Sequence, residues 1–339
     1  MSLLQDLSKK YKTLSIVGMA KNAGKTTALN YLIEEADDEG ICLGITSTGR
    51  DGETQDLVTG TEKPRVFLYE DTIVSVPTQL YDMAEAGLEI VKKSDYRTSI
   101  GDLLLCRVAD SGYVQIAGPV ATAHMKKMCE EMFSMGCRLI LIDGAIDRKS
   151  IASPDTSDAI ILSTGAVLSR SMNKVIEDTA HVVALYSLPE LEAGVARDII
   201  IEHLSEDKIM LISKDGEPKV LNLATGLGSS RFIDDEIDEN TEYVYIPGAF
   251  TNSVIADIHP NKLKTVKFVL KDPTKIFINA MDWGQLRKRG FRPKVMKNIK
   301  IAAITVNPVA PSGYSFDHEV LRDSMQKALP DIPVIDVRL

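Results

Sequence analysis

Cysteine is scarce in this sequence, and none of its four cysteines lies in a CxxC pair. A zinc ribbon or a dithiol redox motif needs such a pair, so the sequence contains neither pattern. The four residues lie in apolar or helical stretches: Cys42, Cys106, Cys129 and Cys137. Cysteines in such stretches behave as small hydrophobic residues, so we expect buried free thiols in a reducing compartment. The five histidines also lack the spacing of a metal-binding set.

Long hydrophobic runs are absent as well. No stretch of about eighteen apolar residues exists, so we expect no membrane-spanning helix. The first residues, MSLLQDLSKKYK, lack the uninterrupted apolar core of a secretory signal. The net charge of -9 at pH 7 repels nucleic acid and anionic membranes, so neither is an expected partner. These features predict a cytoplasmic globular protein.

Short apolar β-type runs alternate with helical stretches, which is typical of an α/β protein whose parallel sheet has helices on both faces. In the first part of the chain we expect strands at 13–17, 41–46, 113–117, 138–142, 159–163 and 182–187, and helices at 26–35 and 121–135. In the later part we expect strands at 243–247, 266–270, 276–279, 299–306 and 333–337, and a helix at 317–329. The 339 residues suit two domains, and we expect them to be 1–204 and a smaller α/β domain at 205–339.

The segment GMAKNAGKTT, from Gly18 to Thr27, follows a predicted strand and opens a predicted helix, as a Walker A phosphate loop does. Its glycines allow a tight turn, and successive backbone N–H groups and the helix dipole favour a bound phosphate. In such a loop Lys25 reaches the β- and γ-phosphates, and the hydroxyl of Thr26 holds Mg²⁺. The other predicted nucleotide-binding residues are Gly18, Lys21, Asn22, Ala23, Gly24 and Thr27. The sequence therefore predicts a P-loop domain that binds a nucleoside triphosphate with Mg²⁺.

Five residues separate Gly18 from Gly24, one more than in the usual GxxxxGK[ST] pattern. The longer loop resembles the deviant P-loop class that includes dethiobiotin synthetase and the cobyric acid synthase relatives. In that class a loop lysine can contact phosphate across a homodimer, but at a spacing one residue longer than that of Lys21. A solvated loop lysine is the simpler interpretation, and a homodimer stays open.

An apolar strand that ends in an acid, LILID at Leu139 to Asp143, is typical of a Walker B motif. Mg²⁺ needs oxygen ligands beyond the phosphates, so Asp143 is a predicted catalytic and metal-binding residue. The sequence Asp143-Gly144-Ala145 also resembles the Glu-Gly-Ala that follows the same strand in dethiobiotin synthetase. The alternative interpretation is an aspartate that caps a helix or a turn.

A second polar segment, Thr46 to Glu53, follows the second predicted strand and belongs at the same sheet edge. Its carboxylates Asp51 and Glu53 are candidates to orient the attacking water, and Asp51 is also a candidate to hold Mg²⁺. Arg50 is a candidate to stabilise transferred charge. Such a segment suits a switch that senses the γ-phosphate, although a polar turn without a catalytic role explains it too.

The nucleotide base is less well defined. Ser163-Thr164-Gly165 is a weak candidate for contact with the base or ribose, and Gly118-Pro119 for the lining of the same cleft. Asn173-Lys174 begins like the guanine-reading NKxD motif, but no aspartate lies two places after Lys174. We therefore expect ATP, with GTP not excluded.

A loop rich in turn-forming residues, Asn307 to Phe316, follows a predicted strand in the later part of the chain. Its prolines limit the flexibility lost on binding, and Tyr314 and Phe316 are favoured anchor types. The loop is therefore a candidate contact for a protein partner. The alternative is that both aromatic side chains pack within their own domain.

Four segments together resemble one protein family: LSIVGMAKNAGKTTALNYLI, ITSTGRDGE, LILIDGAIDRKS and ITVNPVAPSGYSFD. They are similar to the reactivating-factor ATP-binding subunits encoded beside lysine 5,6-aminomutase and ornithine aminomutase. The resemblance runs from end to end of the chain. It implies a cytoplasmic role in amino-acid fermentation, a MutS/MutL-like partner protein, and a B12- and PLP-dependent aminomutase as client. Nucleotide binding would then supply the differential affinity that opens the client so that damaged cobalamin leaves.

Two other functions stay open. An ATP-dependent small-molecule ligase or kinase is favoured by the loop spacing and by Asp143-Gly144-Ala145, which resemble dethiobiotin synthetase. The long later part of the chain counts against it, because that synthetase is a single compact domain. A regulatory protein that binds nucleotide without hydrolysing it is the third interpretation.

Overall fold

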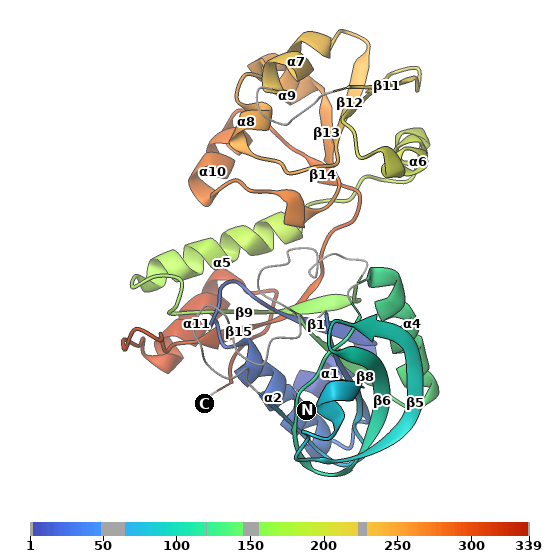
Figure 1. Ribbon diagram of the computed structural model, residues 1–339. Coiled ribbons are helices and arrows are strands. Elements are labelled where there is room, and N and C mark those ends of the chain that lie inside the picture. The colour runs from blue at the N-terminus through green and yellow to red at the C-terminus, as the bar shows by residue number, and fades with distance from the viewer. Residues whose placement is uncertain (1–2, 49–64, 120, 145–155, 223–228, 338–339) are drawn as a thin grey trace. The chain divides into compact units, whose positions relative to one another are not determined.

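The computed structural model describes residues 3–48, 65–119, 121–144, 156–222 and 229–337. The chain forms two compact units, the first from Met1–Ile176 with Ile301–Leu339 and the second from Glu177–Lys300 (Figure 1). None of the helices in the described ranges has the length and apolar character needed to cross a membrane.

The first unit is built on a large, mainly parallel sheet, as the sequence predicts. Its strands, in spatial order, are β16 (Val334–Asp336), β15 (Ile301–Asn307), β9 (Ala159–Gly165), β1 (Thr13–Gly18), β8 (Leu139–Asp143), β2 (Leu43–Ser47), β4 (Ile73–Pro77), β6 (Gly101–Asp110) and β5 (Gly87–Thr98). Neighbours from β16 to β4 are parallel, whereas β4, β6 and β5 pair antiparallel. The carboxyl ends of β2, β8, β1, β9 and β15 therefore meet at one sheet edge, where α/β proteins bind ligands.

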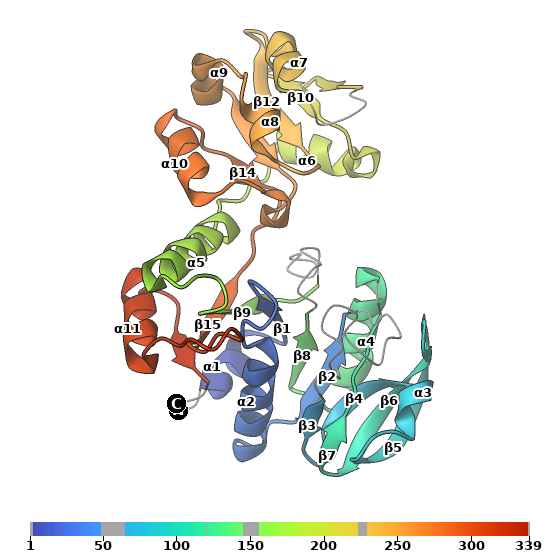
Figure 2. The ribbon, with the colours of Figure 1, turned by 60° about the vertical axis from the view of Figure 1, so that its left-hand side comes forward.

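Helices cover both faces of this sheet (Figure 2). Helices α1 (Leu3–Lys10) and α2 (Lys25–Asp38) bury apolar side chains against one face, and α4 (Thr122–Ser134) against the other. The buried positions of α2 recur every three or four residues: Ala28, Leu29, Leu32, Ile33 and Ala36. This apolar stripe is what predicted a helix from the sequence. The short α3 (Thr78–Tyr81) lies near β4 and β6, and α11 (His318–Ala328) packs beside β16.

The strand predicted at 113–117 does not belong to the parallel sheet. Strand β7 (Gly112–Val114) pairs antiparallel with β3 (Val66–Leu68) in a separate small sheet. The large sheet continues instead through β4, which is followed by the antiparallel pair β5 and β6. The sequence analysis did not predict these three strands. Most side chains of β5 are exposed, so this edge strand lacks the apolar run that marks a buried strand.

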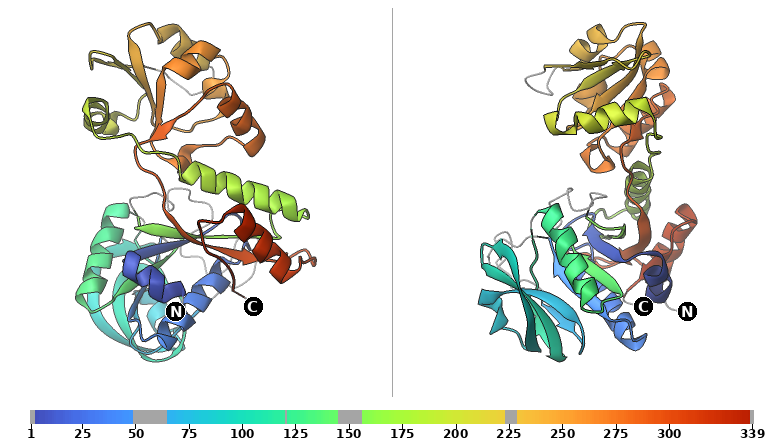
Figure 3. Two further views of the ribbon diagram at one scale, coloured as in Figure 1. Left: turned by 180° about the vertical axis from the view of Figure 1, so that it is seen from behind. Right: turned by 90° about the vertical axis from the view of Figure 1, so that its right-hand side faces the viewer.

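The second unit has its own smaller sheet with helices on both faces (Figure 3). Its strands, in spatial order, are β11 (Pro218–Val220), β10 (Met210–Ser213), β12 (Thr241–Ile246), β13 (Lys267–Leu270) and β14 (Lys294–Val295). Strands β12, β13 and β14 are parallel, and the pairs of β10 with β11 and with β12 are antiparallel. Its helices are α6 (Val195–Glu202), α7 (Ser229–Glu236), α8 (Asn252–Ile255), α9 (Pro260–Thr265) and α10 (Ala280–Lys288), with 3-10 turns η2 (Leu204–Glu206) and η3 (Pro273–Lys275).

Two predicted strands in this part of the chain are wrong. Residues 182–186 lie in α5 (Met172–Tyr186), because a short apolar run such as VVALY fits a buried helix as well as a strand. Residues 276–279 form no strand; Ile276 makes an isolated bridge with Phe250.

The predicted domains, 1–204 and 205–339, differ from the two compact units. Strand β15 pairs in parallel with β9, with Ile304 opposite Leu162, and β16 pairs with β15. Residues 301–339 therefore complete the first sheet, and 177–300 are an insertion between two of its neighbouring strands. An apolar run such as IAAITVN predicts a buried strand but does not show which sheet it joins.

Candidate functional site

The segment Gly18–Thr27 connects the end of β1 to the start of α2, as the sequence predicts. Two of its residues have left-handed backbone conformations, Gly24 with φ of 93° and Asn22 with φ of 64°. Glycine adopts this conformation freely, and asparagine is among the few other residues that tolerate it. The Met19 N–H donates to the Ser163 carbonyl oxygen at 2.9 Å, which attaches the loop to the end of β9.

The amino end of α2 has neither a side-chain cap nor an acidic residue in its first turn. The residue that precedes the helix is Gly24, which has no side chain. The first N–H groups of a helix have no partner within it, and the helix dipole makes this end positive. A 14-residue helix with such an end, at the carboxyl edge of a parallel sheet, can bind an anion.

Lys25 and Asp143 form an ion pair at the same place. The Lys25 Nζ lies 2.6 Å from the buried Asp143 Oδ1 and also donates to the Gly144 carbonyl oxygen. The two side chains are 14% and 25% exposed, so the pair is largely shielded but still reaches solvent. Strands β1 and β8 are neighbours, with Ile16 opposite Asp143, and this register brings the two residues together. The predicted phosphate-binding lysine and the predicted metal-binding aspartate are therefore adjacent.

The end of β2 is tied to the same aspartate through its backbone. The Asp143 carbonyl oxygen accepts from the Ser47 hydroxyl and the Thr48 N–H, both at 3.1 Å, and from the Thr48 hydroxyl at 3.4 Å. Thr46 points into the core instead, where its hydroxyl accepts from Ser75 at 2.7 Å. The rest of the predicted switch lies outside the described residues, including Arg50 and the catalytic candidates Asp51 and Glu53.

The donor groups at this site fit Mg²⁺. Thr26 supplies a hydroxyl in the first turn of α2, and Asp143 supplies a carboxylate, and both are oxygen ligands of the kind that Mg²⁺ prefers. In the described part of the chain, no group of three or more histidine, cysteine, aspartate and glutamate side chains could hold a metal ion.

The two weaker candidates for the nucleotide cleft, Ser163–Gly165 and Gly118–Pro119, lie at the same sheet edge but are packed against neighbouring strands. Ser163 and Thr164 are fully buried, and the Ser163 hydroxyl accepts from Thr305 at 2.8 Å. The backbone at Gly118 lies so close to the Ser47 carbonyl group that a Cβ there would clash with it. Gly118 therefore permits close packing beside β2, and neither candidate presents a free polar side chain for a ligand.

The four cysteines are free, and burial shapes their chemistry. Cys106, Cys129 and Cys137 are buried free thiols, as predicted, whereas the free thiol of Cys42 is only partly buried. Burial raises the pKa of Cys106 to about 11 and that of Cys129 to about 12. Near neutral pH these two side chains are therefore thiols rather than reactive thiolates.

The sequence analysis named Asn307 only as the start of a loop and assigned it no role at the nucleotide site. Asn307, at the end of β15, donates from Nδ2 to the Asn22 carbonyl oxygen at 3.3 Å. A Cβ added to Gly24 would lie 2.9 Å from the Asn307 Cβ, so the two residues are closely packed. The available signal was a polar residue at the carboxyl end of a predicted strand. Because the strand that ends at Asn307 was assigned to the 205–339 domain, the sequence analysis did not place Asn307 near the Gly18–Thr27 segment.

The rest of the Asn307–Phe316 loop is attached to the first unit. The Tyr314 hydroxyl donates to the Ala166 carbonyl oxygen, and the Arg170 guanidinium lies 5.5 Å from the Tyr314 ring centre. Tyr314 also packs edge to face against Phe316 at 5.9 Å. Tyr314 therefore has partners within its own unit, and the loop lies beside the end of β9.

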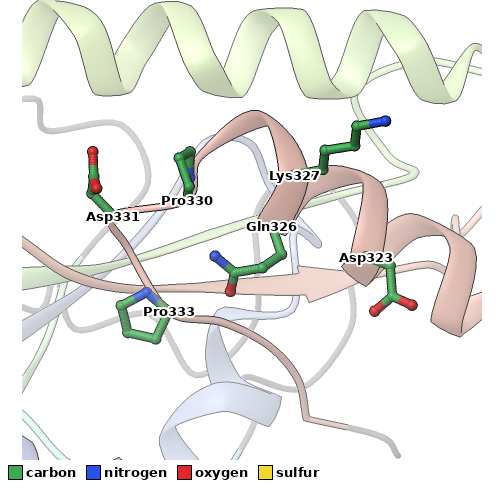
Figure 4. Close-up of a pocket in the computed structure, with 6 residues that line it drawn as sticks. All are labelled: Asp323, Gln326, Lys327, Pro330, Asp331 and Pro333. Carbon is green, nitrogen blue, oxygen red and sulfur yellow. The ribbon is translucent and has the colours of Figure 1, made fainter.

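A surface hollow of about 720 Å³ lies elsewhere in the first unit, at the carboxyl end of α11 and the start of β16 (Figure 4). Its lining residues are Asp323, Gln326, Lys327, Pro330, Asp331 and Pro333. None of the residues predicted for nucleotide or metal binding lines it. We therefore base the functional argument on the Gly18–Thr27 segment and its neighbours.

Comparisons of the chain with models of protein families, with curated proteins and with solved structures give no significant match. The resemblance to the reactivating factors therefore rests on the four sequence segments alone.

Proposed function

We propose that the first unit binds ATP with Mg²⁺ at Gly18–Thr27 and hydrolyses it slowly. The observation that carries the proposal is the Lys25–Asp143 ion pair at the uncapped start of α2. It combines a cation, a carboxylate and a helix start without a side-chain cap at the carboxyl edge of a parallel sheet. These are the groups that a triphosphate with its metal ion requires.

Each of these groups has a role in the proposal. The amides at the start of α2 bind phosphate oxygens, and Lys25 exchanges part of its contact with Asp143 for the β- and γ-phosphates. Thr26 and Asp143 would hold Mg²⁺, which neutralises phosphate charge when bound. The hydrogen bonds from Ser47 and Thr48 to the Asp143 carbonyl oxygen keep the ends of β2 and β8 together, which fixes the backbone of Asp143.

We expect Asp143→Asn to lower ATP turnover about a hundredfold and to change the affinity for Mg-ATP less than about threefold. The substitution keeps the size of the side chain but removes the charge, and one electrostatic group at a reacting phosphate contributes on this order. Single-turnover phosphate release and calorimetry measure the two quantities.

The matched control is Asp336→Asn, which changes another strand-end carboxylate, one bonded to His318 in the first unit. We expect it to leave turnover unchanged. If Asp143→Asn lowered affinity as much as turnover, Asp143 would be a structural residue.

For the biological role we propose reactivation of a B12- and PLP-dependent aminomutase together with a MutS/MutL-like partner. Support comes from the sequence resemblance. A chain with a nucleotide site in one unit and a separate second unit also suits a nucleotide-driven switch. Turnover should then be slow in the isolated protein and should rise when the client and partner are added.

A small-molecule ligase or kinase is the second candidate, and one observation favours it. The first unit forms a complete α/β sheet by itself, with residues 177–300 as an insertion. The length of the chain after residue 204 therefore no longer argues against a compact synthetase-like unit. A metabolite screen for substrate-dependent ADP release separates the two proposals. Strong stimulation by one small acceptor would replace the reactivation role, and no turnover even with partners would favour a regulatory protein.

A further inference from the structure

We infer that Asn307, which follows the inserted residues 177–300 in the sequence, is a positioning residue that holds the Gly18–Gly24 loop in its nucleotide-binding conformation. The inference rests on the proposed function, because it assigns a role within the same nucleotide site. Asn22 and Asn307 are 285 residues apart in sequence, yet their side-chain and backbone groups are in contact.

Both polar atoms of the Asn307 side chain make hydrogen bonds. Its Nδ2 donates to the Asn22 carbonyl oxygen at 3.3 Å, and its Oδ1 accepts from the Val309 N–H at 3.2 Å. Asn307 is only 8% exposed, so its amide is directed by these partners rather than by bulk water. The side chain thus links the loop after β1 to the loop after β15.

The backbone of Asn307 is also held in place. Its carbonyl oxygen accepts from the Ala166 N–H at 2.8 Å, and the absence of a side chain at Gly165 leaves room for this close approach. Strand β15 pairs with β9 along its length up to Asn307 opposite Gly165. The residue therefore has a fixed support from which it can restrain the loop.

The contact falls on the part of the loop with special backbone geometry. Asn22 and Gly24 have positive φ, and Asn307 bonds to the first and packs on the second. These conformations turn the chain into the start of α2, where the anion-binding N–H groups lie. Because Asn22 is exposed, its carbonyl oxygen can bond to water when Asn307 is changed. We therefore expect an effect on loop order and nucleotide affinity rather than on global stability.

The test compares Asn307→Leu with Thr305→Val in the full chain. Leucine matches the shape of asparagine and removes both side-chain hydrogen bonds. Thr305→Val is the matched control, because it removes a buried side-chain bond from the same strand, to Ser163, and has no bond to the loop. The measurements are hydrogen exchange of the 19–24 amides without nucleotide, calorimetry with Mg-ATP, and thermal unfolding. A second variant, Asn307→Ala, covers the case in which leucine does not fit.

We expect Asn307→Leu to speed exchange of the loop amides at least about threefold and to weaken Mg-ATP binding about tenfold, as one lost hydrogen bond allows. Thr305→Val should change neither, and both variants should unfold at similar temperatures. Unchanged exchange and affinity in folded Asn307→Leu and Asn307→Ala would overturn the inference and leave the nucleotide site intact. If the wild-type protein did not bind Mg-ATP, the proposed function would fall, whereas the exchange measurement would still decide whether Asn307 holds the loop.

Discussion

Lys25→Ala should weaken Mg-ATP binding at least about a hundredfold, as measured by calorimetry against the wild-type protein. Hydrogen bonds from a charged donor contribute about 1.5–3 kcal/mol each, and the Lys25 ammonium would make more than one to the β- and γ-phosphates. The fold should tolerate the change. Lys25 is bonded to Asp143 and the Gly144 carbonyl oxygen, and Asp143 retains some contact with solvent when its partner is removed.

Lys21→Ala is the matched comparison, since it removes a second lysine from the same loop. If Lys21 does not contact phosphate, its loss should change the affinity for Mg-ATP less than about threefold. A loss as large as that of Lys25→Ala would instead indicate that Lys21 contacts phosphate, as a loop lysine does in the dimeric members of the deviant class. Unaltered ATP affinity in a folded Lys25→Ala variant would show that the phosphate site is assigned to the wrong residues.

A chain that ends after Lys300 should fail to fold its first unit and should not bind Mg-ATP. The truncation removes β15 and β16 and leaves the buried strand β9 as a bare edge. Strand β15 alone buries three apolar side chains almost completely, Ala303, Ile304 and Val306. Burial of one large aliphatic side chain contributes about 1.5–3 kcal/mol, so the loss of this strand with its pairing approaches the whole stability of a domain.

The control is a chain that ends after Val337, which keeps every strand of the sheet. It should show the same cooperative unfolding by circular dichroism as the full chain. A soluble, cooperatively folded chain of residues 1–300 or 1–204 that bound Mg-ATP would contradict this description of the first unit. It would restore the domain boundary predicted from the sequence.

The sequence analysis predicted secondary structure most accurately where a local pattern fits only one kind of element. The apolar runs of β1, β8 and β9 and the apolar stripe of α2 lie where they were expected. The adjacency of Lys25 and Asp143 followed from one rule: the carboxyl ends of parallel strands share an edge. That rule needs only the identity of the strands and not their full order.

The errors of the sequence analysis had two sources. Some apolar runs fit either a strand or a helix, and some contacts join segments that are far apart in the sequence. The run VVALY suits a strand or a buried helix, and it lies in α5. Strand β4 carries an apolar run, IVSVP, whose signal the sequence analysis overlooked, whereas β5 is largely exposed and gives a weak signal. The role of Asn307 depends on the parallel pairing of β15 with β9, which no local feature of the sequence specifies.

Hydrogen exchange of the wild-type protein with and without Mg-ATP tests the central claim most directly, because it reports both binding and its location. Our account predicts saturable protection of the amides at 18–27, which include the uncapped start of α2, with weaker protection at Thr48 and Gly144. It also predicts that the protection requires Lys25 and is reduced when Mg²⁺ is chelated. Absence of protection at saturating Mg-ATP, or protection confined to the second unit, would contradict the account.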